Sequence, residues 1–452
     1  MTRKAAKPIV GRHIVRYGIA PDQKYLVGDF LKTYDQLVLN ATMVAHMSDA
    51  LASFIMQRTR YKPFFIDPQT HAFQHDISHL QSSSNSSKGE IKKSFRTLLE
   101  SYGEPVQTII GEEHRSVVPK DFEENNLVNE FCERVLDFQI KTLAIKSKSS
   151  AVSKYYEFLK KKGKVSTTNV RPSFVVAPYF CMQGNTLEKW LDINKSCAQN
   201  SAILSSKKKI PLAIQIVITK DILLDSQQIK IALETYSSLK PDIFLIWVDN
   251  FSEQQSSESS LKGFVQFIKG LNQIAPVVNL YGGFFSILLV QTGILAGSTH
   301  SLEYGEQRRV VPVSGGVPVA KYYLPRLHLR LAFRTALRAV RALKGMRNCQ
   351  DFYKNICDCS QCKKVITNNP SVDFAAYGKT KVIRRRQYPT PQTKNNSVRH
   401  YMWCKQKEYK SSLDIKNVQA NLKKVADTLD KEIGTENTEH CRIWSRVISE
   451  VV

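Results

Sequence analysis

Short apolar runs alternate with helical patterns along most of the chain. Eight runs have the length and apolar content of buried strands, and helical segments such as 226–238 and 260–271 separate the last four. Strands that alternate with helices are typical of a parallel sheet with crossover helices. Eight strands of this kind predict an α/β fold, a closed (β/α)8 TIM barrel, with a doubly wound open sheet as the alternative. The runs lie at 14–20, 37–43, 63–66, 174–180, 212–219, 243–248, 277–281 and 298–302.

A long polar interruption separates the third run from the fourth. Residues 81–88 are rich in serine, and Leu127, Phe131, Val135 and Phe138 recur at spacings of three and four. We therefore expect a helical insertion after the third strand, over about 81–165. The chain then divides into a barrel with this insertion over 1–320 and a C-terminal module over 321–452.

The C-terminal module begins with a row of arginines. A helix is predicted to begin near Pro325, because proline suits the first turn of a helix. Arg326, Arg330, Arg334 and Arg338 follow at spacing four, which places them on one helix face. Arginines with no interleaved carboxylate repel one another unless an anion lies along them, so this face indicates phosphate contact. A solvated surface face is the alternative.

The chain is strongly basic. Its 452 residues carry a formal net charge of +25, and positions 321 to 410 hold 21 Lys and Arg against 4 Asp and Glu. Charge concentrated in this way favours nucleic acid as the partner over a merely basic surface. The first residues show no signal-peptide pattern, and no apolar run is long enough for a membrane span. We therefore expect a cytoplasmic protein with no membrane partner.

Three of the nine cysteines fall within six residues, in the pattern C-x-C-x-x-C. Cys357, Cys359 and Cys362 can converge on one ion, and tetrahedral zinc is the usual occupant of such a site. His400 is the preferred fourth ligand, followed by Cys404 and then Cys349. Four protein ligands leave no open position, so the pattern predicts a structural Zn²⁺ site that contributes folding energy.

In a barrel, functional residues gather at the carboxyl ends of the strands. Asp67 follows the third run, Asp249 the sixth, and Gly282 and Gly283 the seventh. Carboxylates that face one cavity could attack an electrophilic carbon and transfer protons, although each aspartate could equally be a helix N-cap. Paired glycines allow a ligand close to the backbone, or form a tight turn. Further candidates follow the eighth run, namely His300, Glu303, Glu306, Arg308 and Arg309.

These motifs together resemble the tRNA-guanine transglycosylase superfamily. In that family a barrel precedes three cysteines and a histidine, and its third strand ends in an aspartate, a turn and an aromatic, as in 65–73 here. The glycine-containing turn at 280–283 and the short run ending in arginines at 297–309 are also similar. The long segment after Phe73 and the wide spacing from Cys362 to His400 are more similar to the branch that inserts 7-deazaguanine bases into DNA.

The resemblance implies a glycosyltransferase that exchanges guanine, in DNA more than in tRNA, for a 7-deazaguanine-type base. A carboxylate would attack C1′ of the target nucleoside, with Glu303 as the nucleophile and Asp249 as the alternative. Asp67 would assist proton transfer and base recognition. The incoming purine base would be bound by Gly282, Gly283, His300, Glu306 and Arg308. The nucleic acid would be held by Arg309, Arg326, Arg330, Arg334 and Arg338. Implied partners are nucleic acid, the modified base, and a second copy of the chain or an accessory protein.

The chain also departs from the family pattern. Its eighth run has no aspartate at the position where the family carries its nucleophile. A nucleic-acid-binding protein on the same zinc-containing barrel, without base exchange, is therefore the second hypothesis. A barrel enzyme that acts on a small anionic substrate and uses the same arginines is the third.

Overall fold

A parallel sheet runs through the first two-thirds of the protein in the computed structural model. Its strands form one path in the order β3-β2-β1-β9-β8-β7-β6-β4, and β5 also pairs with β6. The strands are β1 His13–Tyr17, β2 Gln36–Asn40, β3 Phe64–Asp67, β4 Val175–Val176, β5 Cys181–Met182, β6 Leu212–Ile218, β7 Ile243–Val248, β8 Val277–Asn279 and β9 Gly297–Ser301. The structure describes residues 8–84, 87–146, 170–302, 305–311, 319–383, 385–411 and 414–451.

The two ends of this path meet. The backbone N–H of Ser173, just before β4, donates to the carbonyl oxygen of Phe64 on β3 over 2.8 Å. β4 and β5 are two pieces of one stretch, and both pair with β6, so they count as one strand of the barrel. The nine strands therefore form a nearly closed parallel barrel of eight strands. The predicted parallel α/β fold is confirmed. Within the run 174–180 only Val175–Val176 forms strand, β5 begins directly after the run, and Pro178 lies between the two pieces, where it can donate no backbone hydrogen bond.

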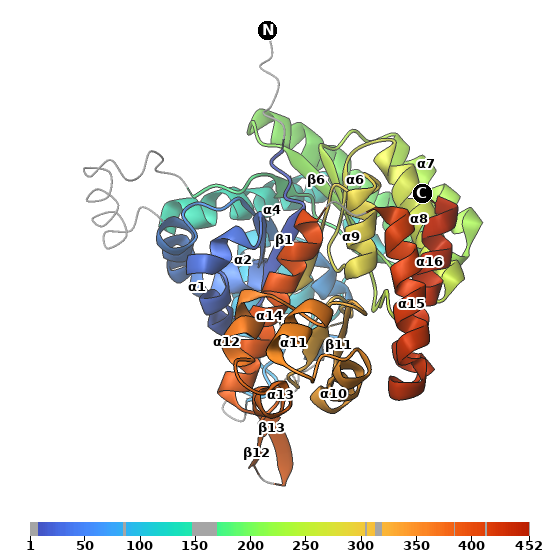
Figure 1. The fold of residues 1–452 in the computed structure, drawn as a ribbon. Coiled ribbons are helices and arrows are strands. Elements are labelled where there is room, and N and C mark those ends of the chain that lie inside the picture. Colours follow the sequence, from blue (N-terminus) through green and yellow to red (C-terminus); the bar gives the residue numbers. More distant parts are fainter. Residues whose placement is uncertain are drawn as a thin grey trace.

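Helices cover the outside of the barrel (Figure 1). The helices that connect one barrel strand to the next include α1 Ala41–Ser53, α6 Leu187–Lys207, α7 Ser226–Ser237, α8 Glu258–Asn272 and α9 Phe284–Gln291. Between β3 and β4 the chain forms α2 Lys93–Tyr102, α3 Val106–Gly111 and α4 Asn125–Lys146. The described part of the segment 81–165 therefore contains helices, and its remainder after 146 lies outside the described residues. No helix of the described ranges is long and apolar enough to cross a membrane.

Alternate residues of each strand point to opposite sides of the barrel wall. Val15 and Leu37 belong to the outer hydrophobic cluster beneath the helices, whereas Ile14, Val38 and Phe65 belong to a smaller inner cluster. The same alternation points a set of polar side chains inward, each two positions along its strand from an inner apolar residue. These polar residues are Arg16, Asn40, Asp67 and Gln215, and all are buried.

The chain after the barrel begins with a hairpin and not with the predicted long helix. β10 Tyr322–Leu324 pairs antiparallel with β11 Leu329–Leu331, and α10 begins only at Phe333 (Phe333–Ala342). The prediction of a helix from Pro325 was wrong, because the chain turns there: Leu327 N–H donates to Leu324 O, and His328 has a φ of 52°. Tyr322, Leu324 and Leu331 are buried as strand residues, so packing overrode the spacing of the arginines.

Short elements follow, and a long helix returns to the barrel. They are α11 Cys349–Asn355, α12 Ser360–Val365, α13 Pro370–Tyr377, β12 Thr380–Ile383, β13 Arg386–Pro389, α14 Pro391–Lys410, α15 Ile415–Ile433 and α16 Glu439–Val451. The Tyr409 hydroxyl of α14 hydrogen-bonds to Ser298, and its ring stacks on His13 at 4.3 Å. Helix α14 therefore covers the barrel wall where β9 meets β1.

Two histidines are buried beneath α14. The Nε2 atoms of His13 and His300 lie 2.7 Å apart, so one ring donates to the other and the accepting ring must be neutral. Burial lowers the pKa of both rings well below the ordinary histidine value, and the charges of neighbouring cations lower them further. Both rings thus act as neutral parts of the interface between the barrel and α14.

We expect this pair to make the protein sensitive to mild acid. Below about pH 6.5 the unfolded chain binds protons that the folded protein refuses, so stability falls by up to about 1.4 kcal/mol per pH unit per histidine. His300→Gln, which does not titrate, should flatten the fall in the urea unfolding midpoint between pH 7.5 and 5. His46→Gln, at an exposed position of α1, serves as the control. An unchanged pH profile in His300→Gln would contradict this assignment.

Candidate metal centre and barrel site

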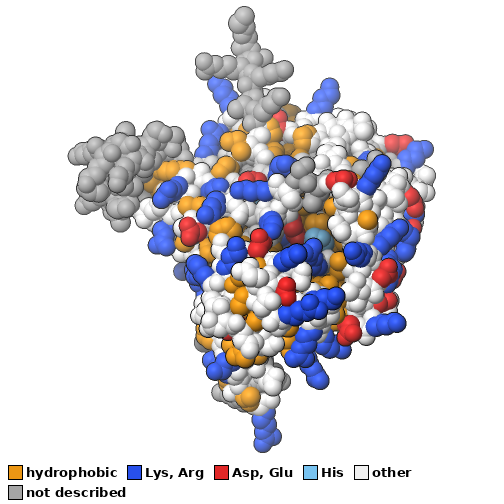
Figure 2. Space-filling model, in the orientation of Figure 1, with side chains coloured by type: hydrophobic (Ala, Val, Ile, Leu, Met, Phe, Trp, Pro, Cys, Tyr) orange, Lys and Arg blue, Asp and Glu red, His pale blue; other side chains and the backbone are white. Residues whose placement is uncertain are grey.

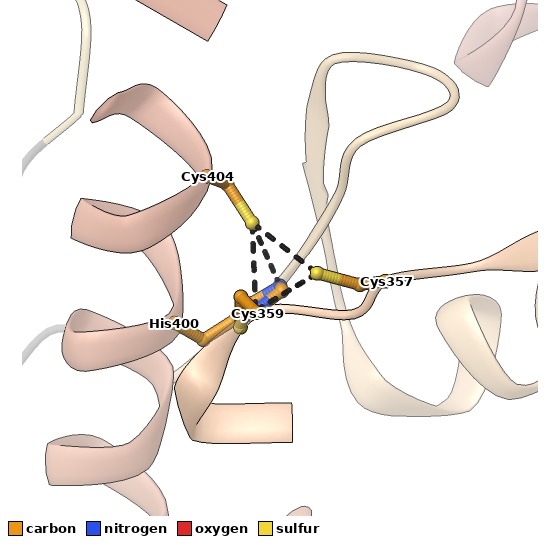
Figure 3. A group of neighbouring side chains, drawn as sticks. All are labelled: Cys357, Cys359, His400 and Cys404. Carbon is orange, nitrogen blue, oxygen red and sulfur yellow. Dashed lines mark hydrogen bonds between the residues drawn. The ribbon is translucent and has the colours of Figure 1, made fainter. Parts of the chain in front are cut away.

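Five potential metal ligands meet where the short elements dock on α14, and Figure 3 shows four of them, Cys357, Cys359, His400 and Cys404. Cys357 and Cys359 lie between α11 and α12, and Cys362 lies in α12. His400 and Cys404 are one turn apart on α14, so their side chains emerge on the same helix face. Residues 40 positions apart in the chain thus reach one point because the α11–α12 connection packs across α14.

The distances among these atoms suit a single ion. The donor atoms of Cys357, Cys359, His400 and Cys404 all lie within 4.8 Å of one another. The Sγ atoms of Cys357 and Cys404 are 3.7 Å apart, and His400 Nδ1 lies 3.3 Å from Cys359 Sγ. Sulfurs bound at about 2.3 Å to a tetrahedral zinc lie about 3.8 Å from one another. This group could therefore hold a metal ion, and its thiol and imidazole donors are consistent with zinc.

The surroundings of His400 prepare it for such a role. Its Nε2 lies 2.6 Å from the carbonyl oxygen of Tyr323, to which it donates, and its ring stacks on Tyr322 at 4.4 Å. A hydrogen bond from the far nitrogen fixes the tautomer and leaves Nδ1, the atom that faces the sulfurs, as a ligand. Hydrogen bonds from neighbouring thiols lower the pKa of Cys359 well below its ordinary value, which favours the thiolate that metals require.

Three of the four predicted ligands, Cys357, Cys359 and His400, come together, and Cys404 joins them where Cys362 was predicted. Cys404, ranked second as the fourth ligand, belongs to the group of four, whereas Cys349 at the start of α11 does not. Cys362 lies outside that group, although its Sγ is 3.4 Å from His400 Nδ1. The site thus offers more sulfurs than a tetrahedral ion needs.

A second group of functional side chains lies inside the barrel, near the carboxyl ends of its strands. Asp67 Oδ2 accepts from Arg16 Nη1 over 3.0 Å, and Asp67 Oδ1 accepts from the Tyr179 hydroxyl over 2.6 Å. Arg16 also donates to Asn40 Oδ1 over 2.5 Å. Tyr179 in turn lies 2.9 Å from His71 Nδ1. The barrel thereby holds a buried ion pair in a chain of hydrogen bonds.

Neighbouring charges keep this cluster in one protonation state. Burial by itself would raise the pKa of Asp67, but Arg16, His71, the Tyr179 hydrogen bond and Arg308 together outweigh it, and the pKa lies below the ordinary value. Burial lowers the pKa of His71 to about 3, so the imidazole is neutral. Arg308 joins the cluster: it donates to the Tyr281 hydroxyl over 3.1 Å, and its charge also favours the Asp67 carboxylate. Two predicted site residues, Asp67 and Arg308, are thus neighbours.

Some polar atoms of this site have no partner among the described residues. Arg16 Nε and Nη2 are buried without one, and so are both side-chain amide atoms of Gln215. Buried polar groups are normally hydrogen-bonded, so such atoms mark a place that a polar ligand or water can fill. Arg16, Gln215 and Tyr179 were not among the predicted site residues. Arg16 and Gln215 could have been found from the sequence, because each interrupts an apolar strand run at an inward-facing position.

The other predicted site residues are spread more widely. Glu306 faces α14, where Tyr401 and Lys405 donate to it over 2.9 and 2.7 Å. Gly283 lies against Glu306 and Glu253, because a Cβ there would approach a carboxylate oxygen of each within 3 Å. Gly282 lies beside Ser286, at the start of α9. His300 points outward to His13.

The two candidate nucleophiles differ in what the structure shows of them. Asp249 Oδ1 accepts from the backbone of Val310 over 2.7 Å. Glu303 lies outside the described residues.

The predicted phosphate-binding arginines fall into two groups. Arg334 and Arg338 are exposed on α10, and Arg309 is exposed after β9. Arg326 instead donates to the carbonyls of Lys354 and Asn355, and Arg330 donates to Leu302 O. Figure 2 shows Lys and Arg side chains gathered over the part of the surface where α10 and α11 lie in Figure 1. The exposed basic surface thus belongs to α10 and its neighbours.

Comparisons with known proteins leave the family open: no protein-family model matches the chain, and no curated protein matches it. Function therefore has to be inferred from the chemistry of the metal centre and the barrel site.

We expect the purified protein to bind about one equivalent of zinc. Its zinc affinity should fall in each of the variants Cys357→Ser, His400→Ala and Cys404→Ser. Loss of an outer-shell partner alone typically costs about 10–100-fold in metal affinity, so loss of a ligand should cost at least about tenfold. Metal content after dialysis against graded chelator measures this. Cys349→Ser is the matched control. If Cys404→Ser retained zinc as the wild-type protein does and Cys362→Ser lost it, Cys362 would replace Cys404 as the assigned ligand.

We expect Asp67→Asn to destabilise the fold by about 3–5 kcal/mol, because it leaves Arg16 buried without its counter-charge. Tyr179→Phe removes only one hydrogen bond to that carboxylate and should cost about 1–3 kcal/mol. Urea unfolding followed by tryptophan fluorescence measures both. Equal and small losses in the two variants would show that the ion pair contributes little.

Proposed function

We propose that the protein is a base-exchange transglycosylase that replaces guanine in nucleic acid, DNA more than tRNA, with a 7-deazaguanine-type base. The observation that carries the proposal is the buried Arg16–Asp67 pair near the carboxyl ends of the strands, next to unpartnered Arg16 and Gln215 atoms. In this reading the nearly closed barrel is a TIM barrel, whose active sites lie at that end.

The chemistry of the cluster suits a planar, polar base. The free donors of Arg16 and the amide of Gln215, which can both donate and accept, complement the edge of a purine. Asp67 is held ionised, so it orients Arg16 and Tyr179 and accepts protons more readily than it gives them. A base inside a duplex cannot reach a buried cluster, so the target nucleotide would first leave its stack.

The nucleophile is assigned to Glu303, which lies between β9 and Arg308 in the sequence. Its carboxylate oxygen would form a bond to C1′ as the C1′–N9 bond of guanosine breaks, and guanine would leave as an anion that takes a proton from water. A nitrogen of the incoming base would then attack C1′, lose its proton to water and displace the carboxylate from C1′. Asp249 is the alternative nucleophile, and the Arg308 charge near Asp67 would favour a departing anionic base.

The basic surface and the metal centre supply the grip on nucleic acid. Arg334 and Arg338 on α10 present their charges to solvent, where phosphates can reach them. The Cys/His cluster fastens the α11–α12 connection to α14, and a structural Zn²⁺ bound there would stabilise that docking. The proposed division of labour is recognition by the C-terminal elements and chemistry in the barrel.

One observation favours a second function, nucleic-acid binding without base exchange. Both oxygens of Asp67 already accept hydrogen bonds, and Asp249 accepts one from Val310, so neither is poised as a free nucleophile. If Glu303 does not react, the same scaffold would only bind nucleic acid.

The decisive experiment is trapping of the covalent intermediate. Incubation with a guanine-containing DNA or tRNA strand should give a protein–nucleic acid adduct that survives denaturation, and labelled guanine should enter the strand. Glu303→Gln should lower the exchange rate by about 1,000-fold or more, since loss of a covalent nucleophile removes the reaction path. Glu188→Gln, an exposed position on α6, is the matched control. Absence of both adduct and exchange in the wild-type protein would leave the binding function.

A further inference from the structure

A separate cavity lies between the barrel and the C-terminal elements. Its volume is about 350 Å³, within the range of about 300–1,000 Å³ that is usual for ligand sites. Its lining includes Leu302 and Gly305, which come soon after β9 in the chain, and residues of the first turns of α14. Tyr323 of β10 and Arg330 of β11 complete it. The cavity is thus built from the barrel and the C-terminal elements together.

The charged residues that line this cavity are all cationic. Lys321, Arg330 and Lys394 come from three different segments, and no described residue of the lining is acidic. Arg330 is fixed in place, because it donates to Leu302 O and its guanidinium lies 3.5 Å from the centre of the Tyr401 ring. Glu306, a buried carboxylate, accepts from Tyr401 and is paired with Lys405, and the charge of Arg330 also acts on it. Such a lining attracts an anion, and arginine with lysine suits a phosphate.

The rest of the lining is aromatic, apolar or hydroxylic. Tyr323 and Tyr401 contribute rings, and Leu302 and Val398 contribute aliphatic surface. The hydroxyl of Ser397 is buried and has no hydrogen-bond partner among the described residues. An inorganic phosphate would contact only the cations and would make no contact with the aromatic and apolar part of the lining. A nucleotide would use both, since its phosphate meets the cations and its base or sugar meets the rings and the hydroxyl.

We propose that this cavity is a nucleotide-binding subsite, which takes the nucleotide next to the reacting one in a nucleic acid strand. The assignment to a strand rests on the proposed function. Leu302 directly precedes Glu303, so a strand whose target nucleotide enters the barrel would pass this cavity with its neighbouring residue. The charge, the rings and the hydroxyl stand on the cavity itself and require only a nucleotide.

Binding of labelled single strands tests the subsite without any exchange reaction. Lys394→Gln and Lys321→Gln should each weaken binding about 3–10-fold at 0.1 M salt, and lower the slope of log affinity against log salt by about 0.7–1. Lys410→Gln, on the last turn of the same helix and exposed, removes the same charge away from the cavity and should change affinity less than twofold. Fluorescence anisotropy with the full-length protein gives all of these values. Equal effects of the three substitutions would overturn the subsite, because only general charge would then matter.

Photocrosslinking locates the nucleotide independently of affinity. A strand with 5-iodouridine, or its deoxy form, next to the target guanine should crosslink to the peptide that holds Ser397 and Tyr401, or to Tyr323. A crosslink only to peptides of α10 would overturn the proposal. Guanosine 5′-monophosphate is the arm for a free nucleotide: full displacement of the crosslink at micromolar concentration would assign the cavity to a free nucleotide and overturn the strand assignment.

The outcomes also separate this inference from the proposed function. Strand binding that depends on Lys394 and Lys321, without any base exchange, would keep the subsite and refute the transglycosylase. Base exchange with strand affinity untouched by both substitutions would keep the transglycosylase and refute the subsite.

Discussion

Lys405 carries its charge into a fully buried position between the barrel and α14. Its Nζ lies 2.7 Å from Glu306, in the loop after β9, and 3.3 Å from Glu408 on its own helix. A buried ammonium without counter-charges would cost several kcal/mol, so the helix can only sit where both carboxylates meet it. Burial lowers the pKa of Lys405, but these carboxylates outweigh burial and raise it, so the ammonium persists. This pairing sets the register between α14 and the loop that leads to Arg308.

The neighbouring face of the same helix carries the metal ligands. His400 directly precedes Tyr401 in the sequence and Cys404 directly precedes Lys405, so a metal held by the first residue of each pair fixes the second by helix geometry. The ring of Tyr401 then stands between Glu306 on one side and Arg330 on the other. Through one rigid helix, the docking of the cysteine connection determines how the loop after β9 is supported.

Much of the barrel could be predicted from the sequence, because its strands are buried on both sides and are therefore mostly apolar. The ligand cluster was also foreseeable, since three cysteines within six residues leave few alternatives. The hairpin at Tyr322–Leu331 was not, because arginines at spacing four fit a helix equally well and only the packing of Tyr322 and Leu324 decides. The Arg16–Asp67 pair joins two strands, and the sequence of neither strand indicates which residue of the other will be its partner. Inward-facing polar residues in the runs were the overlooked clue.

The helix that covers the wall between β9 and β1 begins about ninety residues after β9 ends, and the metal ligands lie in it and about thirty residues before it. A growing chain therefore completes all its strands while that wall is still bare, with His13, Ser298 and His300 open to water. The wall stays exposed until the chain reaches Lys410, and closing so long a connection is entropically costly. A metal that gathers Cys357, Cys359, His400 and Cys404 would shorten the search, so metal supply would govern the maturation of the barrel itself.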